Sequence, residues 1–143
     1  MQFVPIRLKA LKPKETDFEP QTLGDHIRKR RLQLALTQKQ AGDRLGVTSF
    51  TVLNWEKCKT EPPVRSYPAT LRFLAYDPFP EARSLPERLV AVRRSLGWPV
   101  KTAAGHLSVD EATWSSWERG QTGPLRKHRA RLGRLLILAT RGK

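Results

Sequence analysis

Apolar side chains recur at helical spacing through residues 22–80, with charged and polar side chains between them. Such a period predicts amphipathic helices that begin near 22, 37 and 49, and a fourth helix near 68–76. Only residues 4–10 alternate in the manner of a β-strand. The pattern therefore predicts an all-α fold. The inward positions of the first three helices are Leu23, Ile27, Leu34, Ala41, Leu45, Val52 and Trp55.

Cap and turn residues separate the predicted helices. Thr22 with Asp25 three residues later resembles a capping box, and either Thr48 or Ser49 can cap the third helix. Gly46 is suited to a left-handed turn between the second and third helices. Residues 77–80, Asp-Pro-Phe-Pro, form a break that no helix is expected to cross. Two short helices joined at a glycine turn indicate a helix-turn-helix.

The whole pattern occurs a second time, 62 residues later and without a gap. A repeat of this kind indicates that one supersecondary unit is used twice. We expect Leu85, Leu89, Val92 and Leu96 to line the second core, and a last helix to cover about 125–140. The residues that recur at the same offset are Leu23, Arg31, Leu34, Lys39, Ala41, Leu45, Val47, Thr51, Trp55, Glu56, Thr60 and Pro62.

The repeat predicts the domain organisation. Residues 1–21 form a short basic N-terminal arm, residues 22–80 a first helix-turn-helix domain and residues 81–143 a second, helix-turn-helix-like domain. The arm carries Arg7, Lys9, Lys12 and Lys14, which could follow a DNA groove. Its alternating segment could instead pair as a strand with another chain, or the arm could be a flexible leader.

Charge narrows the class of partner. The chain carries 27 Lys and Arg against 13 Asp and Glu, a formal net charge of +14 over 143 residues. An excess of this size indicates a polyanionic partner, either nucleic acid or an anionic membrane face. The membrane alternative is weak because no apolar run approaches the roughly 20 residues of a spanning helix. The single cysteine, Cys58, excludes an intrachain disulfide and favours a reducing, cytoplasmic compartment.

The first copy resembles a known family. Thr37-Gln38, Leu45-Gly46-Val47 and Trp55-Glu56, at their spacing, resemble the phage-repressor and Cro type of helix-turn-helix, the XRE family. The resemblance covers residues 22–76 and, less strongly, 84–138. It implies that the third helix enters the major groove of DNA. The implied DNA-binding residues are Gln38, Thr48, Ser49, Phe50, Thr51, Asn54, Lys57 and Lys59.

These residue types are suited to that role. Asn54 can bond an adenine edge in two places, and Phe50 can pack on a thymine methyl group, although it could also be a partly exposed core residue. Gln38, at the start of the second helix, is expected to bond a phosphate. In the family, the arginine of the first helix pairs with the glutamate that ends the third. The resemblance therefore implies structural ion pairs Arg31–Glu56 and Arg93–Glu118.

The second copy keeps the predicted fold but changes the residues that would read DNA. Val100 replaces the glutamine, and two acids, Asp110 and Glu111, stand at the start of the third helix. Acids at that place disfavour docking on phosphates. We therefore expect this domain to serve packing or dimerisation, whereas the competing view is that both domains read DNA. The accessory DNA contacts that it could supply are Lys101, Ser116, Arg119, Arg126 and Lys127.

The expected function is that of a sequence-specific DNA-binding regulator, a repressor, acting as a homodimer on double-stranded DNA near the nucleoid. The alternative is an antitoxin-like module that holds a protein partner and also binds DNA. No enzyme is expected, because His26, His106 and His128 are isolated and no catalytic motif is recognised. No cofactor and no metal are expected either.

Overall fold

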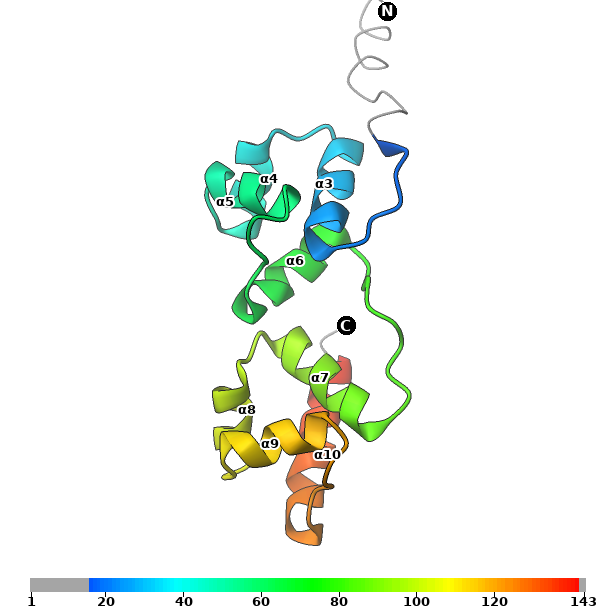
Figure 1. The fold of residues 1–143 in the computed structure, drawn as a ribbon, viewed down its shortest axis with the longest axis vertical. Helices are drawn as coiled ribbons and strands as arrows, with labels where there is room; N and C mark the ends of the chain where they lie inside the picture. The colour runs from blue at the N-terminus through cyan, green and yellow to red at the C-terminus, as the bar shows by residue number, and fades with distance from the viewer. Residues whose placement is uncertain (1–15, 142–143) are drawn as a thin grey trace, which may run out of the picture. The chain divides into compact units, whose positions relative to one another are not determined.

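The computed structural model describes residues 16–141, and every regular element in this range is helical (Figure 1). The range contains eight α-helices and one short 3-10 helix, Val64–Ser66, and no strand. The expectation of an all-α fold is therefore confirmed for the described residues. The strand-like segment 4–10 and the basic residues of the arm lie outside them.

The described chain divides into two compact units. The first comprises the residues up to Pro63 together with Ala69–Pro78, and the second comprises Val64–Pro68 together with the residues from Phe79 onward. This division differs from the boundary expected after residue 80. Within the second unit the Phe79 ring stacks on Tyr67 at 5.8 Å and lies 3.8 Å beneath the guanidinium carbon of Arg94, so contacts join residues 64–68 to the segment after residue 78.

The first unit contains the helices that the apolar period predicts. Their side chains Ile27, Val52 and Leu74 are completely buried, and Trp55 is nearly so. Val47, in the connection between two of the helices, packs against the same core. The helices are α3 (Leu23–Gln33), α4 (Gln38–Leu45), α5 (Ser49–Glu56) and most of α6 (Tyr67–Leu74).

Local sequence explains where these helices begin. Thr22 and Asp25 form the full capping box of α3, in which each side chain accepts a hydrogen bond from the other residue's backbone N–H. Thr37 and Gln40 form a second one on α4. Thr48 caps α5 by accepting the backbone N–H of Thr51. Such caps satisfy backbone donors that have no partner within the helix.

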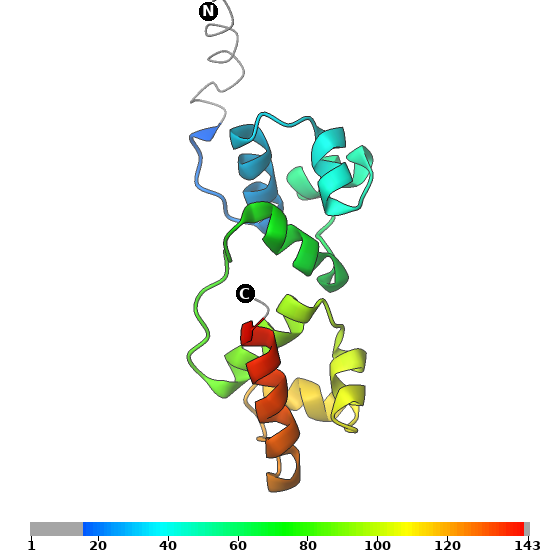
Figure 2. The ribbon, with the colours of Figure 1, turned by 180° about the vertical axis from the view of Figure 1, so that it is seen from behind.

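The second unit repeats this plan. Its first three helices begin 62 residues after α3, α4 and α5, and seen from behind the long last helix lies in front of α7 (Figure 2). Ser84 and Glu87 form the capping box of α7, Asp110 caps α9, and Pro99 precedes α8 without a side-chain cap. The helices are α7 (Leu85–Leu96), α8 (Val100–His106), α9 (Glu111–Glu118) and α10 (Arg126–Arg141).

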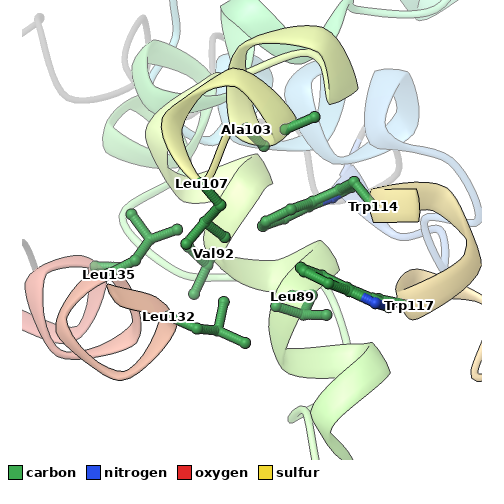
Figure 3. Close-up of a cluster of buried hydrophobic side chains, with 10 residues drawn as sticks. Leu89, Val92, Ala103, Leu107, Trp114, Trp117, Leu132 and Leu135 are labelled. Atoms are coloured by element: carbon green, nitrogen blue, oxygen red, sulfur yellow. The ribbon is translucent and has the colours of Figure 1, made fainter. Parts of the chain in front are cut away.

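Two tryptophans dominate the second core. Trp114 is completely buried and Trp117 nearly so, with their ring centroids 6.0 Å apart. Leu132 and Leu135 point from α10 into this cluster (Figure 3). Leu85 was expected in the core stripe but is 37% exposed, at the first position of α7.

The backbones of the two units also turn left-handed at matching positions. In the first unit the residues with positive φ in the helix connections include Ala35, Gly46 and Cys58, and each has a counterpart with positive φ at the 62-residue offset. Glycine stands in only one copy at each of the three places. The counterparts are Gly97 (φ 72°), Ser108 (φ 57°) and Gly120 (φ 71°).

Candidate nucleic-acid interface

The connection between α4 and α5 is short and tightly held. Gly46 is left-handed with φ 73°, and the backbone N–H of Val47 donates to the carbonyl of Gly42 at 2.9 Å. A Cβ atom on Gly42 would lie only 2.6 Å from the carbonyl oxygen of Val47. The close approach of these backbone segments fixes the direction in which α5 leaves the turn.

One face of α5 is left open to solvent by this packing. Val52 and Trp55 are buried, whereas 68% of Phe50 is exposed. Asn54 lies one turn after Phe50 and Lys57 follows α5 as its C-cap, so the three share one side of the helix. Within the described residues the Asn54 side chain makes no hydrogen bond. An unused amide and a bare aromatic ring therefore lie side by side.

The remaining candidate residues around α5 differ in their exposure and in their hydrogen bonds. Ser49, at the first position of the helix, is exposed, as are Lys57 and Lys59 after its end. The hydroxyls of Thr48 and Thr51 bond to each other at 3.0 Å, so both act in the cap. Cys58 is exposed and left-handed, with Sγ 3.4 Å from the hydroxyl of Thr22.

The inner end of α5 is tied to α3 by an ion pair. Arg31 donates from Nε to Glu56 Oε2 at 2.6 Å and from Nη2 to Oε1 at 2.9 Å. Only 13% and 4% of the two side chains are exposed. Arg31 also donates to the carbonyl of Leu36 at 3.0 Å. The pair therefore holds α3, α5 and the start of the α4 connection together.

Gln38 has a role that sequence reasoning missed. Its Nε2 donates to Glu56 Oε1 at 3.2 Å, so the amide belongs to the ion-pair cluster as well as to the start of α4. The sequence expectation was a bond to phosphate only. The carboxylate of Glu56, nearly buried, gains a third donor in this way, because a buried charge needs several bonds to offset its lost hydration.

The basic run of α3 is engaged within its own unit. Lys29 donates to the carbonyl of Phe18 at 2.9 Å, and Arg30 donates to the carbonyl of Phe73 at 3.2 Å. The guanidinium of Arg28 lies 5.1 Å from the centre of the Phe18 ring. These cations hold neighbouring segments in place and are less available to an external phosphate than their position in the sequence indicates.

The start of α9 in the second unit is acidic where the start of α5 is neutral. Asp110 and Glu111 are both exposed. Hydrogen bonds from the Thr113 side chain and backbone lower the pKa of Asp110, so its carboxylate stays charged in weak acid. Two negative groups at this helix end repel a phosphate backbone.

The accessory candidates of the second unit are dispersed. The Ser116 hydroxyl, at the position that corresponds to Asn54, bonds the Thr122 hydroxyl at 2.8 Å. Arg119 donates to the side chain of Gln121 at 3.3 Å, and Lys101 is exposed on α8. The first two residues of α10, Arg126 and Lys127, are exposed. No single face of α9 therefore collects these residues.

The second unit has its own ion pair and a different third donor. Arg93 donates from Nε to Glu118 Oε2 at 2.7 Å and from Nη2 to Oε1 at 3.1 Å. The indole N–H of Trp114 donates to the same carboxylate at 2.6 Å. Val100 cannot donate, so the indole replaces the amide of Gln38. The sequence carries a sign of this change of donor. At the 62-residue offset, Val100 replaces Gln38, and Trp114 replaces Val52.

The three histidines, isolated in the sequence, each contact an aromatic ring. His26 Nδ1 lies 2.7 Å from the hydroxyl of Tyr76, and burial lowers the pKa of His26 while it raises the pKa of Tyr76. His106 lies beside Trp98, and His128 beside Trp117. Residues 16–141 contain no group of three or more His, Cys, Asp or Glu side chains placed to hold a metal ion.

The candidate interface is thus one exposed face of α5 in the first unit, with a chemically altered counterpart in the second. Among the described residues, no helix has the length and apolar character needed to cross a membrane. The chain matches no family model, no curated protein and no solved structure.

Proposed function

We propose that this chain is a sequence-specific DNA-binding regulator of the XRE type, with α4 and α5 as a helix-turn-helix and α5 as the helix that reads the major groove. The second unit is then a helix-turn-helix-like twin that does not read bases. Binding, not catalysis, is the proposed activity, and the proposed location is the cytoplasm, at the nucleoid.

The observation that carries this proposal is the exposed face of α5. A phenylalanine that is 68% exposed adds nothing to the core of its own unit, and it lies beside the unpaired amide of Asn54. An α-helix fits the major groove, in which asparagine bonds adenine and an aromatic ring packs on the thymine methyl group. The tight α4–α5 connection supports the same proposal because reading bases requires a helix of fixed direction.

Charge supports nucleic acid as the partner. The net charge of +14 favours association with a polyanion, and Lys57 and Lys59 are exposed at the end of α5. Binding is expected to weaken steeply with salt, because each phosphate contact releases counterions. We further propose a homodimer that acts as a repressor, with half-sites about 34 Å apart or a multiple of that distance.

Selection of bound fragments from random double-stranded DNA tests the proposal. The full chain is expected to enrich one motif, and Asn54→Ala to lose preference at one base pair by about 1–3 kcal/mol of discrimination. Ser116→Ala is the matched control at the same offset. It should leave the motif unchanged, because the Ser116 hydroxyl is already bonded to Thr122.

The other outcomes separate the alternatives. A palindromic motif indicates a symmetric dimer, and an asymmetric one indicates tandem reading by both units. If Ser116→Ala alters base preference as strongly as Asn54→Ala, both units read DNA and the assignment to α5 alone is wrong. If no motif is enriched, the regulator proposal fails, and a module that holds a protein partner becomes the better explanation.

A further inference from the structure

Five cations cover the outward side of the first half of α10. All five are exposed, while Leu132 and Leu135 on the opposite side are buried against the core of the second unit. Residues 119–143 contain no Asp or Glu. The cations, here called the α10 basic face, are Arg126, Lys127, Arg129, Arg131 and Arg134.

The α10 basic face has no internal partner in the part of the chain that the structure describes. The ion pairs there join Arg31 to Glu56, Lys39 to Asp43 and Arg93 to Glu118, and no side chain of the face forms a hydrogen bond. The basic run of α3 is the contrast, since Lys29 and Arg30 donate to carbonyls of their own unit. The cations of α10 are therefore not required to hold the unit together.

The same cations oppose the stability of the helix that carries them. Arg126, Lys127 and Arg129 lie in the first turn of α10, where the helix dipole favours negative charge, and that turn has no acid. Arg126 and Arg129, and Lys127 and Arg131, are like-charged neighbours at helical spacing. A bound polyanion removes both sources of repulsion.

From this charge arrangement we propose that the α10 basic face binds the phosphate backbone of duplex DNA independently of base sequence. Residues 126–134 cover about 12 Å of helix, a length over which duplex DNA presents roughly seven charges. The inference rests on the proposed function for its choice of DNA. It gives the second unit a role distinct from base reading: this unit adds affinity through α10, not through the acidic start of α9.

The structure favours DNA over a membrane surface for this face. A helix that lies in a membrane interface buries a broad apolar side among the lipids. The apolar side of α10 already packs in the core through Leu132, Leu135 and Ala139, which leaves Ile137 and Leu138 as the exposed large apolar residues of its described part. The five exposed cations outnumber this short apolar pair, so the exposed side of α10 is better suited to phosphates than to lipid chains.

The salt dependence of binding tests the inference. The full chain and the double variant Arg131→Gln/Arg134→Gln are titrated with a fluorescent duplex that lacks the selected motif, between 50 and roughly 200 mM salt. The slope of log K against log salt should fall by about 2, since each lost phosphate contact removes about 0.9. The matched control is Arg83→Gln/Arg88→Gln, which removes the same charge from exposed positions of the same unit and should leave the slope near its wild-type value.

Two further measurements decide the outcome. The thermal midpoint of the α10 variant should be unchanged or slightly raised, which excludes unfolding as the cause of a smaller slope. An unchanged slope, or an equal loss in the control, overturns the inference, as does binding to anionic vesicles that needs α10 while binding to DNA does not. These results differ from failure of the proposed function, in which no motif is selected although α10 still sets a salt-dependent affinity.

Discussion

The two units share an Arg–Glu ion pair between their first and third helices but differ in the residue that gives the glutamate its third hydrogen bond. Both join the first helix to the third through an Arg–Glu pair, and both give the glutamate a third donor. In the first unit that donor is Gln38 on the second helix, and in the second it is Trp114 on the third helix itself. Both glutamates thus receive a third hydrogen bond, but from different residues on different helices.

The two donor residues also differ in how exposed they are to solvent. Gln38 is only partly buried at the start of α4, where its amide bonds Glu56 at the end of α5. The indole of Trp114 is completely buried and offers nothing outside. The third donor of the first unit is therefore a partly buried side chain, whereas that of the second unit belongs to the core.

Removing the glutamate should have the largest effect on either unit. Glu56→Ala leaves Arg31 nearly buried without its counter-charge, which is expected to cost about 3–5 kcal/mol of the free energy of unfolding. Trp55 is the first unit's tryptophan, so its 19F resonance after fluorotryptophan labelling follows that unit during urea unfolding.

Glu118→Ala is the matched variant in the second unit, followed through Trp98, Trp114 and Trp117. It should cost a similar amount because the Trp114 indole also loses its acceptor. A loss below about 1 kcal/mol in either variant, the range of an exposed pair, would show that the pair does not hold that unit together.

A Cβ atom at Gly24 should be the next most disruptive change. It would lie 1.9 Å from the carbonyl oxygen of Trp55, a backbone atom that cannot move aside alone. Gly24→Ala is therefore expected to cost about 1–3 kcal/mol despite the better helix propensity of alanine. Gly133→Ala, with nothing within 4 Å of the added atom, is the control and should not destabilise α10. Equal urea midpoints for the two variants would contradict the close approach of α3 and α5.

The left-handed positions should respond in opposite directions in the two units. Ser108→Gly removes the penalty of a side chain at φ 57° and is expected to stabilise the second unit by up to about 1 kcal/mol. Gly46→Ser is the reverse substitution at the corresponding position. It should destabilise the first unit by a similar amount, although the space around Gly46 is open. Thermal unfolding of both variants checks the pair, and shifts of the same sign would refute the correspondence.

The smallest effect concerns pH and should be confined to the first unit. The pKa of His26 is lowered from its ordinary value of 6.5, chiefly by burial. The unfolded chain therefore takes up a proton at higher pH than the folded one does. Stability from this residue is present above about pH 6.5 and falls as the pH drops below it.

His26→Gln should flatten that dependence in urea unfolding measured between about pH 7.5 and 5. The second unit has Arg88 at the corresponding position, which does not titrate in this range. A slope that persists in His26→Gln would assign the pH dependence to another group.

Much of the helical framework follows from the sequence because it rests on local signals. The period of apolar residues gives α3 to α5, and the predicted caps Thr22 and Thr48 mark helix starts as the structure has them. The ion pairs that the resemblance implied, Arg31–Glu56 and Arg93–Glu118, are present.

Other features depend on contacts between distant segments and could not be predicted from local pattern. Residues 64–68 belong to the second unit, in which Tyr67 stacks on Phe79, and no helical period reveals this. The bond from Gln38 to Glu56 depends on how α4 packs beside α5. The reading of bases by α5 stays a prediction, since it concerns a partner.

The three shared turns have a consequence for how such a fold changes over evolutionary time. At each left-handed turn one copy has an ordinary residue, namely Ala35, Ser108 or Cys58, where the other has glycine. None of the three left-handed turns therefore strictly requires glycine. The glycine at any one of them can be substituted during evolution while the backbone path is kept. A search pattern that insists on the glycine after the second helix would detect the first copy of this chain and pass over the second.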